Sequence, residues 1–149
     1  QTFVVLLLGI SFGYKIGSAT VILYLMEGII GLPVFSNSPE KGVGLVYFTG
    51  PTMGYLVGFI LAVFLIGYLK LHDWTKKGAK SVKFFFINLI KLIISVSTIY
   101  ILGLIWLSNL IGFEKALIFG LKPFWAAELF KITLLAFLIP FILKFRKFI

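Results

Sequence analysis

The sequence predicts an all-α protein, built as a polytopic bundle of helices inside a membrane. Of its 149 residues, 60% are hydrophobic and 13% are charged, whereas about a quarter of a soluble domain is charged. The mean hydropathy is +1.11, and three apolar runs exceed the roughly 18–20 residues that cross the hydrocarbon core of a bilayer. Because the chain has no internal repeat and no low-complexity tract, we expect one transmembrane domain over residues 1–149.

Glycines, prolines and one hydrophilic stretch divide the chain into five predicted spans. The first span is short, so it is expected to be a partial or tilted helix, and Gly13 and Gly17 mark the break after it. The hydrophilic connection of residues 70–83 separates the third span from the fourth. The predicted spans are Thr2–Phe12, Ile16–Ile30, Pro51–Leu69, Phe84–Ile111 and Phe119–Phe145.

The stretch from Gly31 to Gly58 differs from the apolar runs on either side of it. It holds three prolines and six glycines. Proline cannot continue a helix from within, and glycine adopts backbone conformations that other residues cannot. We therefore predict a connection with a specified shape, and loops of this size in compact proteins are usually functional. Gly54 and Gly58, four residues apart, are expected to let another helix approach closely.

The positive charges predict how the spans are oriented. Residues 70–83 contain five lysines, and the C-terminal tail adds Lys144, Arg146 and Lys147. If the spans alternate, these residues lie with Lys15 on one side, which the positive-inside rule assigns to the cytoplasm. The connections after residues 30 and 111 then lie outside. Five spans would leave Gln1 outside, so we expect a further helix upstream, giving six spans with both ends inside.

Several classes of function are excluded by what the sequence lacks. The net charge of +9 does not indicate nucleic-acid binding, because the basic residues cluster at the ends of apolar runs, which is the distribution of the positive-inside rule. The expected partner is membrane lipid, not nucleic acid. With no cysteine and a single histidine, His72, we predict no metal site and no cofactor. The sequence shows no nucleophile–base arrangement of the kind that would indicate an enzyme. No GxxxxGK[ST] motif is present, so energy for transport would come from a gradient or a partner.

The last predicted span carries two charges, Glu128 and Lys131, and charges inside a bilayer are costly. Three residues apart in a helix, they share one face. A carboxylate accepts hydrogen bonds and an ammonium donates them, so the pair suits a small ligand with adjacent donors and acceptors. The alternative is an ion pair that only tightens the bundle. Tyr55, one turn into the third span, is placed to stack on a ligand. Trp106 and Trp125 lie near the outer span ends, typical of an aromatic belt.

Five segments, in order across nearly the whole chain, resemble the BioY family, the biotin-specific substrate-capture (S) components of energy-coupling-factor (ECF) transporters. The GLPVF segment together with GPTMGY is the most specific part of the resemblance. The matching segments are QTFVVLLLG (1–9), YLMEGIIGLPVF (24–35), SPEKGVGLVYFTGPTMGYLVGF (38–59), YILGLIWL (100–107) and PFWAAELFK (123–131).

The resemblance implies a six-helix S component in the plasma (inner) membrane of a bacterium. It implies that biotin is captured from outside and delivered inward with a transmembrane coupling subunit and ATPase subunits. A carboxylate could accept the ureido N–H groups of biotin, and a lysine could meet its carbonyl or its carboxylate tail. The implied substrate-binding residues are Glu128, Lys131, Tyr55, Gly54, Thr52, Lys41 and Glu40.

Two positions depart from the family pattern. Met53 and Gly54 stand where family members usually carry two glycines, and Glu128 stands where they usually carry aspartate. Two other readings stay open at this point. One is an S component for another vitamin, which the GLPVF and GPTMGY segments argue against. The other is a non-transporting membrane protein in which the charged pair only joins helices.

Overall fold

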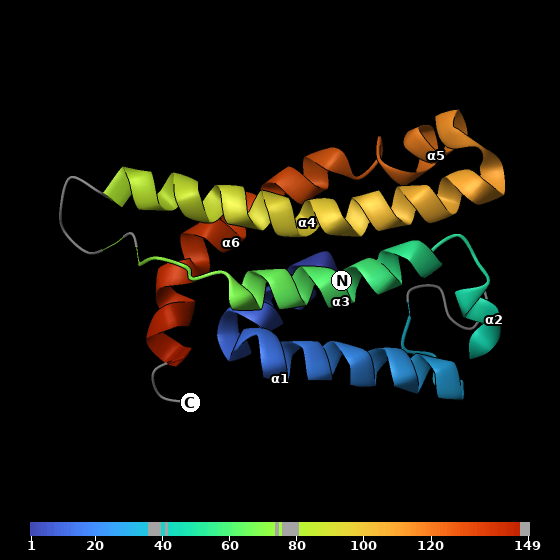
Figure 1. The fold of residues 1–149 in the computed structure, drawn as a ribbon, viewed down its shortest axis with the longest axis horizontal. Helices are drawn as coiled ribbons and strands as arrows, with labels where there is room; N and C mark the ends of the chain where they lie inside the picture. The colour runs from blue at the N-terminus through green and yellow to red at the C-terminus, as the bar shows by residue number, and fades with distance from the viewer. Residues whose placement is uncertain (36–39, 41, 74, 76–80, 147–149) are drawn as a thin grey trace.

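The computed structural model describes residues 1–35, 40, 42–73, 75 and 81–146, and the described elements are all helices (Figure 1). Three of these helices, α1, α4 and α6, are long and apolar enough to cross a membrane, and α3 is a shorter apolar helix. The fold class is therefore the predicted one. The elements are α1 (Thr2–Ile30), α2 (Leu45–Phe48), α3 (Met53–Tyr68), α4 (Ser81–Ile111), α5 (Phe113–Gly120) and α6 (Trp125–Phe145).

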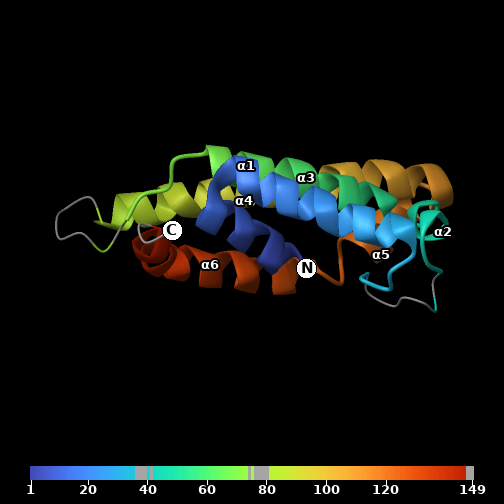
Figure 2. The same cartoon turned by 90° about the horizontal axis from the view of Figure 1, so that it is seen from below.

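Helix α1 consists of two halves separated by a break at Gly13. The φ angle of this residue is 76°, a conformation that glycine adopts without strain. The two halves fold back toward each other (Figure 2), and a Cβ at Gly17 would lie 3.2 Å from the Cα of Gly9. The first half runs only from the middle of the bundle to one end (Figure 2). The predicted break and the predicted partial first span are both confirmed.

Helix α3 lies between α1 and α4 and contacts both through glycines. A Cβ at Gly58 would lie 2.6 Å from the Cα of Ile99, and a Cβ at Gly54 would lie 2.6 Å from the Cβ of Trp106. On the opposite side, a Cβ at Gly67 would lie 2.5 Å from the backbone nitrogen of Tyr14. The expected close helix approach at Gly54 and Gly58 is confirmed, and its partner is α4.

The predicted fifth span is wrong at its start. Phe119 belongs to the short helix α5, and the long helix α6 begins only at Trp125. Pro123 explains the gap, because the residue before a proline is pushed out of the helical region. The fourth helix begins at Ser81 rather than Phe84, and α2 within the 31–52 connection was not predicted at all.

The two ends of the bundle differ in their connections. The bend in α1, the end of α3 and the end of α6 lie at one end, and α2 and α5 lie at the other (Figure 1). At the first end Arg146 donates to the carbonyl of Ile10 at 3.4 Å, and Lys91 Nζ donates to the carbonyl of Lys70. Lys70 and Arg146 thus lie at the same end, as the alternation of spans predicted, whereas Lys115 belongs to α5 at the other end.

The connection after α3 is held against α4 by a buried amide. Asn88, which is fully buried, accepts the backbone N–H of His72 at 3.0 Å and donates to its carbonyl at 2.7 Å. Buried backbone polar groups need such partners. The His72 ring stacks on Phe84, with ring centroids 4.8 Å apart. The predicted hydrophilic connection therefore starts with a fixed segment.

Candidate functional site

A cavity of about 600 Å³ lies among the helices, and its lining includes residues of α5 and of the turn that leads into α3. Its size falls within the roughly 300–1,000 Å³ of ordinary ligand pockets. Its walls come from five parts of the chain: the start of α1, the start of α3, the middle and end of α4, α5, and the start of α6. The lining residues are Gln1, Thr2, Pro51, Thr52, Tyr55, Phe59, Ile99, Tyr100, Leu107, Ile111, Phe119, Gly120, Phe124, Glu128 and Lys131.

The charged pair of α6 forms the most polar part of this wall. Lys131 Nζ donates to Glu128 Oε1 at 2.8 Å, as the three-residue spacing predicted. The Glu128 side chain is 8% exposed, whereas that of Lys131 is 33% exposed. Glu128 Oε2 is buried and has no hydrogen-bond partner among the described residues. Since an unpaired buried acceptor costs free energy, this oxygen is suited to accept an N–H group from a ligand.

Two tyrosines form an aromatic wall beside the pair. The rings of Tyr55 and Tyr100 meet edge to face, with centroids 5.9 Å apart. The Tyr55 hydroxyl donates to the carbonyl of Gly120 at 3.0 Å, so this hydroxyl already joins α3 to α5. The Tyr55 ring packs where Gly103 has no side chain. The aromatic faces can therefore pack an apolar part of a ligand, while the Tyr55 hydroxyl holds the wall in place.

In the part of the chain that the structure describes, no three His, Cys, Asp or Glu side chains gather as a metal site would require. What the cavity offers is a buried acceptor, an ammonium donor and aromatic surface. Such an arrangement binds a small, partly polar molecule.

Comparison with known proteins identifies the family. The model of the BioY family matches residues 1–148. The chain belongs to the BioY family. It is 32% identical over 131 residues to "Probable biotin transporter BioY" of Pyrococcus horikoshii, covering 88% of this chain and 70% of that protein. It is 36% identical over 137 residues to "Biotin transporter BioY" of Thermotoga maritima, covering 91% of this chain and 74% of that protein.

A solved structure shares the fold of this BioY chain. It is described as the S-component for biotin from an ECF-type ABC transporter. The two structures superpose with a TM-score of 0.78 at 28% sequence identity, over 97% of this chain and 74% of the other. The match confirms the membrane helix bundle and the S-component fold that the resemblance implied.

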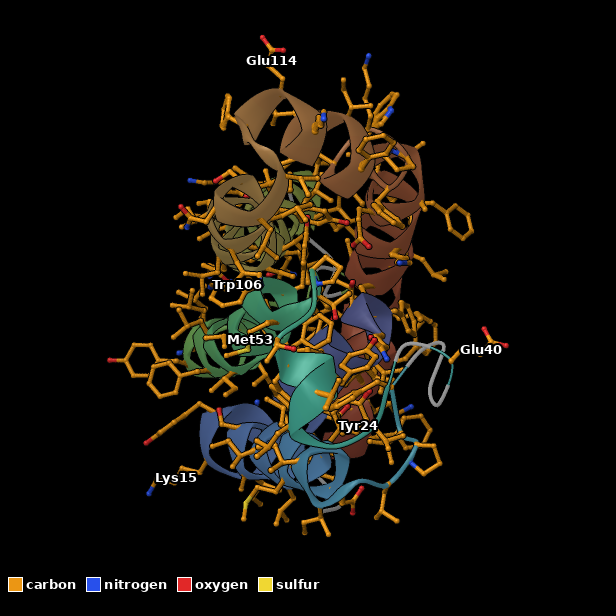
Figure 3. All side chains as sticks on the ribbon, turned by 90° about the vertical axis from the view of Figure 1, so that its right-hand side faces the viewer. Lys15, Tyr24, Glu40, Met53, Trp106 and Glu114 are labelled. Atoms are coloured by element: carbon orange, nitrogen blue, oxygen red, sulfur yellow. The ribbon has the colours of Figure 1, made fainter. Side chains whose placement is uncertain are left out.

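The structure brings four of the seven predicted site residues of this BioY chain to one cavity. They are Glu128, Lys131, Tyr55 and Thr52. Gly54 does not line the cavity, because it faces α4, where its missing side chain makes room for helix contact. Glu40 is exposed and points away from the bundle (Figure 3). Lys41 lies outside the described residues.

Several lining residues were missed by reasoning from single residues. Tyr100, Phe124 and Gln1 line the cavity, but neither spacing nor charge singles them out in apolar segments. A signal was nevertheless present, because all three lie within segments that carry the family resemblance. Phe119 was missed because it was assigned to a long helix, whereas it projects from α5.

Proposed function

We propose that the protein takes up biotin, acting as the membrane-embedded S component that captures biotin from outside the cell. One observation carries the proposal: a chain of the BioY family places the Glu128–Lys131 pair in an aromatic-walled cavity of about 600 Å³. The family gives the class of ligand, and the cavity gives the chemistry that recognises it. Capture requires no covalent step, so no catalytic residue is invoked.

The chemistry of biotin complements that of the cavity. Its ureido group has two N–H donors, and Glu128 Oε2 is a buried acceptor without a hydrogen-bond partner in the described part of the chain. Lys131 supplies a donor for an acceptor atom of biotin, and its partial exposure lets it turn toward the ligand. The rings of Tyr55 and Tyr100 pack the apolar bicycle. Glu128 has one methylene more than the aspartate usual in the family, so we expect its carboxylate to extend further from α6.

Delivery of biotin inward involves partners of this chain. The printed sequence has no phosphate-binding GxxxxGK[ST] loop, so we propose that an ATPase and a transmembrane coupling subunit of an ECF module supply the energy. The end that carries Lys70, Lys91 and Arg146 is proposed to face the cytoplasm, because basic residues accumulate there. The lining residues that belong to α5 then lie toward the outer face, from which biotin arrives.

The decisive experiment measures biotin binding to the purified full-length protein by titration calorimetry. Saturable binding in the micromolar range or tighter is expected. Riboflavin and thiamine serve as control ligands, because they test the reading as an S component for another vitamin. Absence of saturable biotin binding, or tighter binding of a control vitamin, would refute the assignment.

A further inference from the structure

The side chain of Trp106 joins α4 to the turn that leads into α3. Its indole Nε1 donates to the carbonyl of Gly50 at 2.9 Å, across 56 positions of sequence. Trp106 itself does not line the cavity, but the two residues after Gly50, Pro51 and Thr52, do. A hydrogen bond between such distant segments fixes where this part of the cavity rim lies relative to α4.

Gly54 makes this contact possible. Because Gly54 has no side chain, the Cβ of Trp106 and the backbone of Leu102 lie directly against α3, and a Cβ added at Gly54 would come within 2.6 Å of the Cβ of Trp106. Figure 3 shows Trp106 beside the start of α3, which the label of Met53 marks. Gly54 and Trp106 are thus complementary in shape, and the close helix approach brings the indole within reach of Gly50.

The turn has few other means of holding its position. The Gly50 carbonyl also accepts the backbone N–H of Met53, but at 3.4 Å this bond is long. Pro51 has no N–H to donate. The hydroxyl of Thr49 bonds the carbonyl of Val46, within the same segment. Among the described residues, the hydrogen bond that the indole of Trp106 donates to Gly50 therefore joins this turn to the neighbouring long helix α4.

We propose that Trp106 is a positioning residue for biotin binding, which sets the place of Pro51 and Thr52 at the cavity rim through the Gly50 carbonyl. The inference rests on the proposed function. It differs from the aromatic-belt role that the sequence suggested, because a belt tryptophan directs its N–H to lipid headgroups. Here the indole N–H of Trp106 donates to a backbone carbonyl of the protein itself. Trp125, which is 58% exposed, fits the belt role instead.

The test compares Trp106→Phe with Trp125→Phe in the full-length protein. Both changes remove an indole, but only Trp106→Phe removes the bond to Gly50. Loss of one neutral hydrogen bond that positions the rim should weaken biotin binding about three- to tenfold, with Trp125→Phe binding like the wild type. Hydrogen exchange should rise in residues 50–56 of the Trp106 variant, a local change that general loss of stability would not produce.

A second variant covers the case in which Trp106→Phe does not fold. Benzothienylalanine keeps the ring shape of tryptophan and replaces the indole N–H by sulfur. Replacing the other two tryptophans, Trp74 and Trp125, by phenylalanine leaves position 106 as the one site at which this analogue is incorporated in place of tryptophan. Equal biotin affinity with indole and with benzothiophene at this position would overturn the inference, as would equal affinity of the two phenylalanine variants. Failure of the wild type to bind biotin would instead refute the proposed function, so the two failures are distinguishable.

Discussion

Replacing Glu128 by glutamine tests whether the charged pair serves the ligand. The change keeps the size of the side chain but removes the negative charge from the buried oxygen that lacks a partner among the described residues. A hydrogen bond to a charged group contributes roughly 1.5–3 kcal/mol, and about 1.4 kcal/mol corresponds to a tenfold change in affinity. Biotin binding to Glu128→Gln is therefore expected to weaken by about ten- to a hundredfold.

The same change should have little effect on folding. Lys131 is 33% exposed and lines the cavity, where water can reach its ammonium, so we expect the ion pair to contribute about 1 kcal/mol or less to stability. Neutralising Glu128 also removes the cost of burying a carboxylate. We expect the melting temperature to change slightly while the affinity falls strongly. Calorimetric titration with biotin and thermal unfolding of the same samples measure the two effects separately.

Glu114→Gln is the matched control. Glu114 is exposed on α5 at the same end of the bundle, points away from it and does not line the cavity (Figure 3). This substitution should leave biotin affinity unchanged.

The double variant Glu128→Gln, Lys131→Met decides between the two roles of the pair, because it removes both charges without leaving either one unpaired. A stable double variant with native biotin affinity would place the ligand elsewhere and refute the reasoning.

Three further predictions concern the rest of the bundle. In this cysteine-free chain, an impermeant thiol reagent should label Glu114→Cys in intact cells and Thr75→Cys only after permeabilisation; the opposite pattern would reverse the topology. Asn88→Leu leaves both partly buried backbone groups of His72 without the Asn88 amide, which should cost about 1–3 kcal/mol for each group and lower the melting temperature, whereas Asn109→Leu, at an exposed site, should not. Equal melting temperatures would show that the Asn88 amide does not hold the connection after α3 against α4. Burial, and then two nearby lysines, lower the pKa of His72, so the folded state favours the neutral ring. Stability should therefore fall as the pH drops below about 6.5, and a pH dependence unchanged in His72→Phe would contradict this.

The part of the fold that follows from local sequence was predicted well. The break at Gly13 and the close approach at Gly54 and Gly58 follow from the absence of a side chain. The pairing of Glu128 with Lys131 follows from helix geometry alone. The start of α6 was missed because an apolar run gives no hydrophobic period to separate a short surface helix from a span. Only the proline at 123 carried that information.

The sequence by itself determined the membrane class, the charged pair and the family resemblance. These depend on composition, on spacing along one helix and on short motifs, all of which are properties of neighbouring residues. Which residues meet across helices was decided by the tertiary structure. It joined Thr52, Tyr55 and Tyr100 to the pair in one cavity, and it placed Gly54 against α4, outside the residues that line the cavity. It also gave the indole of Trp106 a partner 56 positions away. The physical reason is that in an all-round apolar helix the sequence does not mark the face that packs, so side-chain shape across the interface selects it.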